Sequence, residues 1–504
     1  MSRIFKILVI VFFMVPNLLF AQSVLVSDFD REDTRDMNFE IIGKMNSNIL
    51  VYKNIRSKHK ISIFDKDMNT VETVKLDFIP EKTFNIDFVS YPDHFYMIYQ
   101  YQKGSIVHCM GVKMDANAQR LSEPVELDTT RISVFTDNKI YSTIFSEDHQ
   151  RIMIFKVQTR NQKFNLQTLL LDSDMKPITR KQYVVDYNEK KESYDNFLLA
   201  NDGNFVFTHA KQSGNWDNAS ALALVMKAPQ QDTFSYRPMD LKEKYVDQVK
   251  LKIDNRNGRY IINTYYLKKS RANIEGLYTC LWDRANDKAI ASTLTEFYDS
   301  LRDEAKTTGM LRFAFDNFFI RQVIVKADGG FILTAEDYSS DSRGNNNFNR
   351  YNYLYNPYSF SSGNYYYYNP YNNFYRPYNN LNTQQSVRYY YDNIVVMSFN
   401  KTGQEQWTKV IHKSQFDDND ENFLSFSTMT SGSEIHFLFN DDRKFQIVSD
   451  QSFSPDGTNK RYPTLRSQQK GYEFMPSLSK QTGASQIIIP CAYRANLCFA
   501  KIDF

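Results

Sequence analysis

The sequence predicts an all-β chain in which one unit of four short strands is repeated along almost its whole length. Aromatic residues make up 15% of the 504 residues and include 39 Phe and 34 Tyr, which favour strands over helices. Tight polar turns followed by β-branched or aromatic runs recur about every 50 residues, and such turns are typical of hairpins.

The first turn of the unit, with the strand that follows it, occurs eight times. The copies begin at Asn46, Tyr91, Glu147, Asn201, Asn255, Ala327, Ser431 and Thr482. A second turn, rich in Asp and Asn, follows the third strand at Asp65, Asp115, Asp172 and Asn400. Four short strands per unit with variable loops are typical of propeller blades. We therefore expect a single β-propeller over residues 22–504.

Eight blades are the first choice for this propeller, and seven blades with one degenerate unit are the second. The last unit ends at Phe504 without a fourth strand, and residues 23–29 form a strand that belongs to no unit. Pairing of these two chain ends would close the ring and remove two free sheet edges. An assembly of two β-sandwich domains is the remaining alternative.

The repeat resembles a known class of exported propellers. The Asp-Gly first turns at Asp202 and Asp328, together with residues 453–457 (Phe-Ser-Pro-Asp-Gly), look like the blades of TolB-type propellers. The Trp-Asp pairs at Trp216 and Trp282 lack the rest of the WD40 pattern. The resemblance implies a fold and no activity.

One helix is expected between the fifth and sixth units. Residues 293–296 (Thr-Leu-Thr-Glu) form a capping-box pattern. Phe297, Leu301 and Ala305 then fall on one helical face.

The N-terminus predicts export. In residues 1–21, Arg3 and Lys6 precede a short apolar run, and a secretory signal would be cleaved after Ala21. We expect the chain in the periplasm, at the outer membrane or outside the cell, without a transmembrane span but with peripheral membrane association possible. Without Arg3 and Lys6 the net charge falls from +3 to +1, which gives no electrostatic attraction to nucleic acid.

Two of the four cysteines are candidates for a disulfide. If Arg494 and Ala495 form a two-residue turn, Cys491 and Cys498 lie directly opposite each other on paired strands. An exported compartment is oxidising, so a structural bridge is predicted. Metal binding by this pair would require two further soft ligands, and none lies nearby in the sequence.

A Tyr/Asn-rich insertion at residues 341–391 interrupts the sixth unit. Residues 342–391 contain no Asp, Glu or Lys and retain four Arg. Such a segment can be a mobile surface loop, a binding loop in which Tyr supplies rigid contact area, or a self-associating tract. The binding candidates are Tyr355, Tyr358, Tyr365, Tyr366, Tyr367, Tyr368, Tyr371, Tyr375 and Arg376.

An Asp also recurs just before the first strand of several units, where these carboxylates would surround the mouth of the central channel. These channel-mouth candidates are Asp36, Asp87, Asp137, Asp195, Asp247, Asp316 and Asp420. Each carboxylate either accepts backbone N–H groups in a turn or helps to hold a cation or a cationic ligand.

No catalytic, metal or cofactor motif is found, and the seven His are scattered without ligand spacing. The sequence therefore favours a non-enzymatic binding or scaffold protein of the cell envelope, with a protein or a glycan as its partner. The alternatives are a hydrolase or lyase that uses carboxylates at the channel mouth, and a structural subunit of an outer-membrane assembly.

Overall fold

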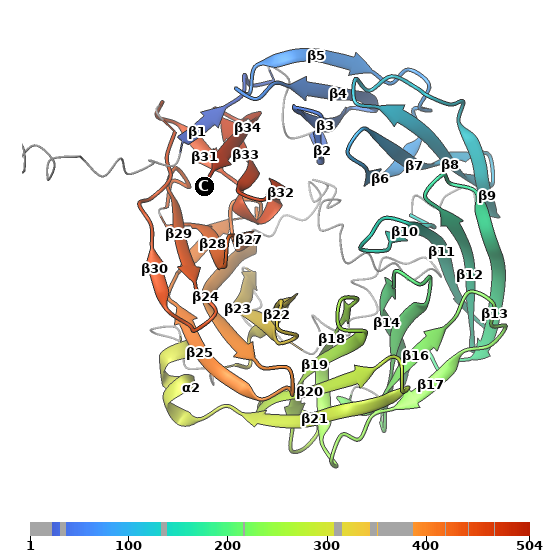
Figure 1. Ribbon diagram of the computed structural model, residues 1–504, viewed down its shortest axis with the longest axis vertical. Helices are drawn as coiled ribbons and strands as arrows, with labels where there is room; N and C mark the ends of the chain where they lie inside the picture. The colour runs from blue at the N-terminus through green and yellow to red at the C-terminus, as the bar shows by residue number, and fades with distance from the viewer. Residues whose placement is uncertain are drawn as a thin grey trace, which may run out of the picture.

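The chain folds into antiparallel sheets arranged in a ring around a central space, which is the all-β propeller architecture (Figure 1). The computed structural model describes residues 23–504 except 31–36, 133–138, 215–216, 307–314, 343–349, 351–386, 419, 442 and 468. The predicted signal segment, residues 1–21, therefore lies outside the described residues. Within the described part, no helix combines the length and hydropathy that crossing a membrane requires.

The first three sheets contain four strands each, numbered from the channel outward. The first is formed by β2 (Met37–Met45), β3 (Asn48–Ile55), β4 (Lys58–Phe64) and β5 (Thr70–Lys75). The second is formed by β6 (Thr83–Ser90), β7 (His94–Lys103), β8 (Ile106–Asp115) and β9 (Val125–Arg131). The third is formed by β10 (Ser142–Phe145), β11 (Arg151–Arg160), β12 (Lys163–Asp172) and β13 (Pro177–Asp186).

An eight-stranded sheet follows, and it has two halves. The first half is formed by β14 (Glu192–Leu199), β15 (Phe205–Gln212), β16 (Ala219–Lys227) and β17 (Ser235–Pro238). The second half is formed by β18 (Tyr245–Asp254), β19 (Arg259–Leu267), β20 (Gly276–Asp283) and β21 (Lys288–Glu296). The paired residues Ala219 and Val246 join the halves. The predicted count of eight blades depends on dividing this sheet there, and it stays a prediction.

Three further sheets complete the ring. One contains β22 (Phe318–Val325), β23 (Phe331–Ser342), β24 (Val387–Phe399), β25 (Glu405–Ile411) and β26 (Gln415–Asp418). The next contains β27 (Phe426–Ser431), β28 (Glu434–Asn440), β29 (Val448–Phe453) and β30 (Asn459–Arg461). The last contains β31 (Tyr472–Phe474), β32 (Lys480–Gly483), β33 (Gln486–Tyr493), β34 (Asn496–Asp503) and β1 (Ser23–Val26), and a 3-10 helix spans Pro476–Leu478.

The two ends of the chain pair with each other, as the sequence predicted. Strand β1 is antiparallel to β34, with Val24 opposite Ile502 and Val26 opposite Ala500. A hydrophobic cluster also joins the last sheet to the first, because Ile488 and Phe499 pack with residues of β2 and β3 such as Ile41 and Val51. The orphan N-terminal strand thus covers an edge that would otherwise be open.

The recurring second turn has one hydrogen-bond pattern. In the turn after β4, the Oδ1 atom of Asp65 accepts the backbone N–H groups of Asp67 and Asn69 at 2.9 and 2.8 Å. Asp115, Asp172 and Asn400 accept N–H groups two and four residues later in the same way. A short side chain with an acceptor oxygen therefore stabilises each turn.

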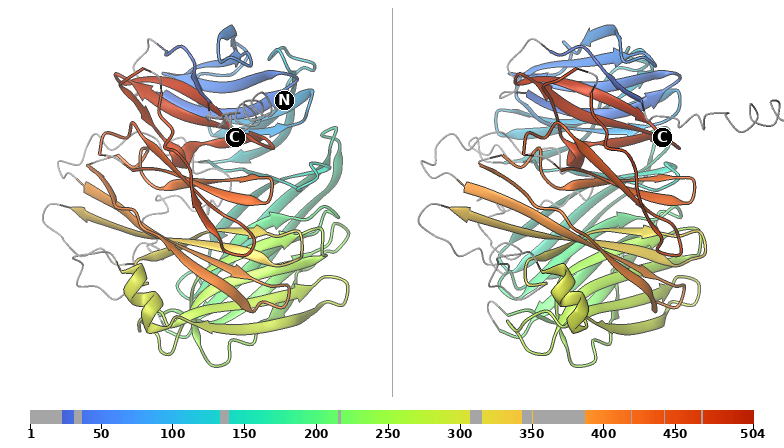
Figure 2. Two further views of the ribbon diagram at one scale, coloured as in Figure 1. Left: turned by 60° about the vertical axis from the view of Figure 1, so that its left-hand side comes forward. Right: turned by 90° about the vertical axis from the view of Figure 1, so that its left-hand side faces the viewer.

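The predicted helix is present but begins later than expected. Helix α2 spans Asp299–Ala305, and it lies on the outer side of the ring (Figure 2). Leu301, Ala305 and the preceding Phe297 are buried in one cluster. The capping-box interpretation of residues 293–296 is wrong, because these residues continue β21 and pair with β20, so their backbone groups are used by the sheet.

The insertion is shorter than the sequence indicated. Strands β23 and β24 remain paired from Phe331 opposite Phe399 outward to Ser342 opposite Val387. Tyr389, Tyr390 and Tyr391 therefore belong to β24 rather than to a loop. Their backbone groups complete the ladder with β23, and residues 389–391 also pair with β26.

Candidate functional site

The variable loops leave the sheets at one end, which we call the insertion face. Because successive strands of a sheet are antiparallel, loops between second and third strands emerge at the same end as the connections between sheets. The insertion stem at Ser342 and Val387, helix α2 and the connection from β13 to β14 therefore share this face.

A groove opens at this face between the sheet β10–β13 and the half-sheet β14–β17, and we call it the Tyr194 groove. Its lining residues are Gln162, Asp186, Tyr187, Asn188, Glu192, Tyr194, His209, Lys211, Ala221, Leu222, Ala223, Tyr236 and Pro238. They enclose about 640 Å³ of space accessible to water. This volume lies within the range of about 300–1,000 Å³ that small-molecule sites occupy.

Strand pairing places the lining residues of the half-sheet in two rows. Tyr194, His209, Ala223 and Pro238 are consecutive cross-strand partners on β14, β15, β16 and β17. In the next row, Glu192 pairs with Lys211, which pairs with Ala221. Directly paired residues point to the same side of a sheet. The small side chains of the two alanines on β16 leave room there.

Aromatic rings form the floor of the groove. The rings of Tyr194 and His209 are stacked, with centroids 4.4 Å apart and an interplanar angle of 12°. The hydroxyls of Tyr194 and Tyr236 are 2.9 Å apart. The Tyr187 hydroxyl donates to the backbone oxygen of Glu192 at 2.8 Å, which fixes its ring against β14. Tyr187 and Tyr194 are 4% and 6% exposed, so the floor is rigid.

The charges of the groove are balanced. Lys211 forms an ion pair with Glu192 at 3.0 Å, and the exposed Asp186 pairs with Lys163. Burial lowers the pKa of His209, although the nearby Glu192 carboxylate opposes this shift. His209 Nε2 lies 3.5 Å from Glu192, too far for a good hydrogen bond. At neutral pH the groove therefore combines a neutral imidazole with one internal ion pair.

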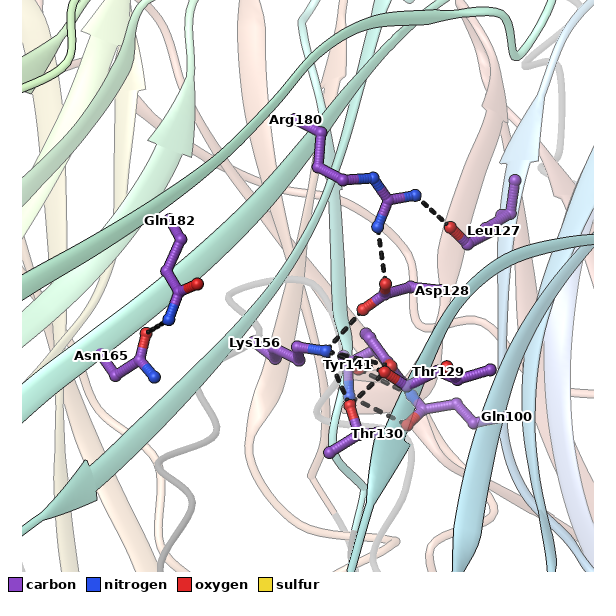
Figure 3. Close-up of polar contacts among 10 residues, drawn as sticks. All are labelled: Gln100, Leu127, Asp128, Thr129, Thr130, Tyr141, Lys156, Asn165, Arg180 and Gln182. Carbon is purple, nitrogen blue, oxygen red and sulfur yellow. Dashed lines mark hydrogen bonds and ion pairs between the residues drawn. The ribbon is translucent and has the colours of Figure 1, made fainter.

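A second cleft lies on the other side of the sheet β10–β13, and we call it the Lys156 cleft. Figure 3 shows the Lys156 ammonium pointing at acceptors on β9. It donates to Asp128 at 2.6 Å, to the backbone oxygen of Thr129 at 3.1 Å and to the Thr130 hydroxyl at 2.8 Å. Arg180 reaches the other oxygen of Asp128 at 2.6 Å.

The Lys156 cleft is closed by its own side chains. An ammonium has three protons, and these three acceptors use them. The Thr130 hydroxyl also contacts the Tyr141 hydroxyl at 2.6 Å, and Gln100 accepts the backbone N–H of Tyr141 at 2.9 Å. The two spaces along the cleft have volumes of only about 190 and 250 Å³. The network joins the second and third sheets and leaves little for a ligand to bind.

The predicted channel-mouth aspartates lie in different local settings. Asp87, Asp195 and Asp247 lie within β6, β14 and β18 rather than before them, because these inner strands begin earlier than the sequence indicated. Asp87 pairs with Lys139 at 3.0 Å. Asp420 accepts the backbone N–H of Asn422 at 2.8 Å, as in the turn interpretation.

The remaining channel-mouth candidates add no cluster. Asp316 precedes β22, and Asp36 and Asp137 lie outside the described residues. Among the residues that the structure describes, no three His, Cys, Asp or Glu side chains are placed to hold a metal ion. Nothing in the sequence indicated that Glu40 on β2 is buried, and it is only 9% exposed. Burial raises its pKa to about 7, although Lys480 opposes the shift.

The insertion candidates Tyr355, Tyr358, Tyr365, Tyr366, Tyr367, Tyr368, Tyr371, Tyr375 and Arg376 lie outside the described residues. One described residue of the insertion contacts the propeller. Arg350 donates from Nε to Asp247 at 2.9 Å, and its guanidinium lies 4.3 Å from the ring centroid of Phe319. Asp247 therefore holds a cationic side chain of this chain.

The cysteine pair is placed as predicted. Cys491 is directly opposite Cys498, and Arg494 and Ala495 form the turn with positive φ values of 49° and 64°. The sulfur atoms are 2.8 Å apart. The disulfide itself stays a prediction.

Sequence reasoning overlooked the Tyr194 groove. The available signal was the alternation of Glu192 with Tyr194 on β14 and of His209 with Lys211 on β15, which marks one face of each strand. The contribution of Gln162 and Tyr187 carried no such signal, because it depends on the packing of a neighbouring sheet.

A scan against protein-family models finds no match, and a search of curated proteins finds no similar sequence. Similar solved structures include prolyl oligopeptidase B from Galerina marginata, at a TM-score of 0.42 and 9% identity over 92% of this chain and 56% of that chain. The chain thus spans about half the length of that protein.

Two other solved structures are similar over most of both chains. The WD40 domain of SCAP from fission yeast matches at a TM-score of 0.40 and 8% identity, over 96% of this chain and 98% of that one. A eukaryotic initiation factor matches at 0.37 and 10%, over 95% and 90%. The similarity is limited to the fold.

Proposed function

We propose that this chain is a non-enzymatic binding protein of the cell envelope, in which the propeller is a scaffold for one binding face. The insertion face presents the Tyr/Asn-rich segment to a protein or a glycan. The observation that carries the proposal is the coincidence on one face of the insertion stem and the Tyr194 groove. Binding sites combine a concave, mostly apolar surface with a few polar groups, which this groove offers.

The way in which the propeller holds the insertion supports this role. Strands β23 and β24 carry it on a paired stem, and Arg388 of the stem contacts Asp418 of β26 at 2.7 Å. Arg350 anchors the segment again at Asp247 on β18. A binding loop held on rigid strands loses less conformational freedom when it captures a partner.

The envelope location is part of the proposal and rests on the signal-like pattern of residues 1–21. Its test is the fractionation of cells that produce the full chain. Recovery in the periplasm, the outer membrane or the medium, with residues 1–21 removed, is expected. Recovery of the uncleaved chain in the cytoplasm would contradict it.

The binding role is tested by replacing residues 352–384 with a short Gly/Ser linker. This variant keeps Arg350 and the stem, so the propeller should unfold at the same temperature as the parent chain. We expect it to lose capture of its partner from envelope extracts, and then to lose binding to that partner in purified form.

A second variant keeps the length of the insertion. Here the tyrosines at 355, 358, 365–368, 371 and 375 are replaced by Ser, which removes aromatic area but no residues. Loss of binding in both variants supports the proposal. Undiminished capture by the variant that lacks residues 352–384 would refute it.

A further inference from the structure

We propose that the Tyr194 groove is a binding site for a neutral sugar residue of a glycan. The inference rests on the proposed binding role. It names the class of ligand for the Tyr194 groove, which shares the insertion face with the stem of the Tyr/Asn-rich segment. The site is formed by residues between 162 and 238, far in the sequence from the insertion.

The floor of the groove suits the apolar face of a sugar ring. Tyr194 stacks on His209, and the His209 ring meets Tyr236 edge-on with centroids 5.6 Å apart. Tyr236 is half-buried, so part of its ring borders the open space. Amphipathic rings of this kind offer apolar contact area next to hydroxyl groups that form hydrogen bonds.

The rim of the groove suits sugar hydroxyls. Glu192 supplies a carboxylate acceptor, Lys211 an ammonium donor, and the exposed Gln162 and Asn188 supply amides that both donate and accept. Lys211 is 54% exposed and can turn toward a ligand. The buried His209 lines the same space, with its Nε2 atom 3.5 Å from a Glu192 oxygen.

The charge of the groove favours a neutral ligand. Glu192 and Lys211 neutralise each other, and so do Asp186 and Lys163. His209 adds no charge at neutral pH because burial lowers its pKa. An anionic ligand would find no cation in excess, and a cationic ligand would find no carboxylate in excess.

Isothermal titration of the purified chain with maltotriose, cellotriose, mannotriose, laminaritriose and triacetylchitotriose tests the inference. Trigalacturonate, which is anionic, serves as the comparison. We expect at least one neutral trisaccharide to bind and trigalacturonate to bind more weakly. Because single sugar sites are weak, titration has to reach about 10 mM ligand.

Two variants place the binding in the groove. Ala221→Trp fills the space from the exposed edge of β16, and we expect binding to weaken about tenfold or more. Tyr236→Ala removes one aromatic ring of the floor and should weaken binding about fivefold. Ala285→Trp, at an exposed turn between β20 and β21, is the matched control and should bind as the parent does.

Each outcome decides the inference. Neutral-sugar binding that Ala221→Trp weakens and Ala285→Trp does not would support it. Three results would overturn it: binding of trigalacturonate alone, no binding of any neutral probe, or neutral-sugar binding that Ala221→Trp leaves unchanged. The variant without residues 352–384 keeps the groove and should still bind the sugar. Sugar binding together with unchanged partner capture by that variant would refute the proposed function and leave the groove site standing.

Discussion

Two clefts flank the sheet β10–β13, the Lys156 cleft and the Tyr194 groove. They occupy equivalent places in the fold, but their lining side chains differ. In the Lys156 cleft, one buried ammonium satisfies acceptors on β9 and the second and third sheets are joined by charge. In the Tyr194 groove, aromatic rings line the floor and two alanines on β16 leave space. The side chains along a gap between two sheets thus decide whether it is closed by a network of charges or stays open as a groove.

The difference also concerns how each region would respond to substitution. A closed network of buried charges loses much when one member is removed, because the partner remains buried without compensation. An open groove loses little stability when its exposed edge changes, since those side chains already contact water.

Removal of the Lys156 ammonium should have the largest effect. Lys156→Met leaves the Asp128 carboxylate, whose side chain is 18% exposed, with Arg180 as its remaining charged partner. We expect the free energy of unfolding to fall by about 2–3 kcal/mol, as measured by urea denaturation. Lys163→Met removes an exposed pair with Asp186 and should cost less than about 0.5 kcal/mol. Equal losses of unfolding free energy in Lys156→Met and Lys163→Met would contradict a stabilising role of the Lys156 network.

Acid should weaken the two regions in different pH ranges. Burial lowers the pKa of His209 below its ordinary 6.5, so its contribution to stability is present above that pH and is lost as the pH falls below it. Burial would raise the pKa of Asp128, but Lys156 and Arg180 hold it below the ordinary 3.8. The stability from Asp128 is therefore lost only in stronger acid, below about pH 4.

Thermal unfolding across pH 3–8 checks this order. The difference in unfolding temperature between the parent chain and His209→Gln should shrink as the pH falls from 7 to 5. The difference in unfolding temperature between the parent chain and Asp128→Asn should stay constant over that range and shrink only below about pH 4. The reverse order would show that the electrostatics of the two regions have been misassigned.

The hydroxyl pair of Tyr194 and Tyr236 should make a smaller contribution. Tyr236→Phe removes one partner of the 2.9 Å contact and keeps the ring. We expect a loss of about 1 kcal/mol in the free energy of unfolding, which is typical of a single hydrogen bond. A loss as large as that of Lys156→Met would indicate that the groove is also a structural clamp.

The exposed edge of the groove should have the smallest effect on stability. Ala221→Trp adds a large side chain at an exposed position of β16, and the free energy of unfolding should change by no more than about 0.5 kcal/mol. A large loss would mean that Ala221 is needed for packing rather than for an open site.

Local patterns in the sequence predicted much of the fold. The turn at Asn46, the Asp65-type turns and the register of Cys491 with Cys498 all follow from residues close together in the chain. The pairing of β1 with β34 followed from counting strands, because one unit lacked its fourth strand. The error at residues 293–296 arose because a helix-capping pattern and a strand can share the same residues, and pairing with β20 decided between them.

The candidate site was much less accessible from the sequence. Tyr187 and Gln162 come from one sheet and His209 and Tyr236 from the next, so their proximity depends on how two sheets pack. The recurring aspartates were predicted to act together because they repeat along the chain. Two of them, Asp87 and Asp247, form ion pairs with Lys139 and Arg350 of the same chain.

The most direct test of the contrast between clamp and site is ligand-detected NMR, in which saturation passes from the protein to a bound sugar. The measurement uses the five neutral trisaccharides with the parent chain, Ala221→Trp and Lys156→Met. We predict saturation of sugar ring protons by the parent and by folded Lys156→Met, and its loss with Ala221→Trp. Saturation of sugar protons that persists with Ala221→Trp, or that is lost only with Lys156→Met, would show that the sugar does not bind in the Tyr194 groove.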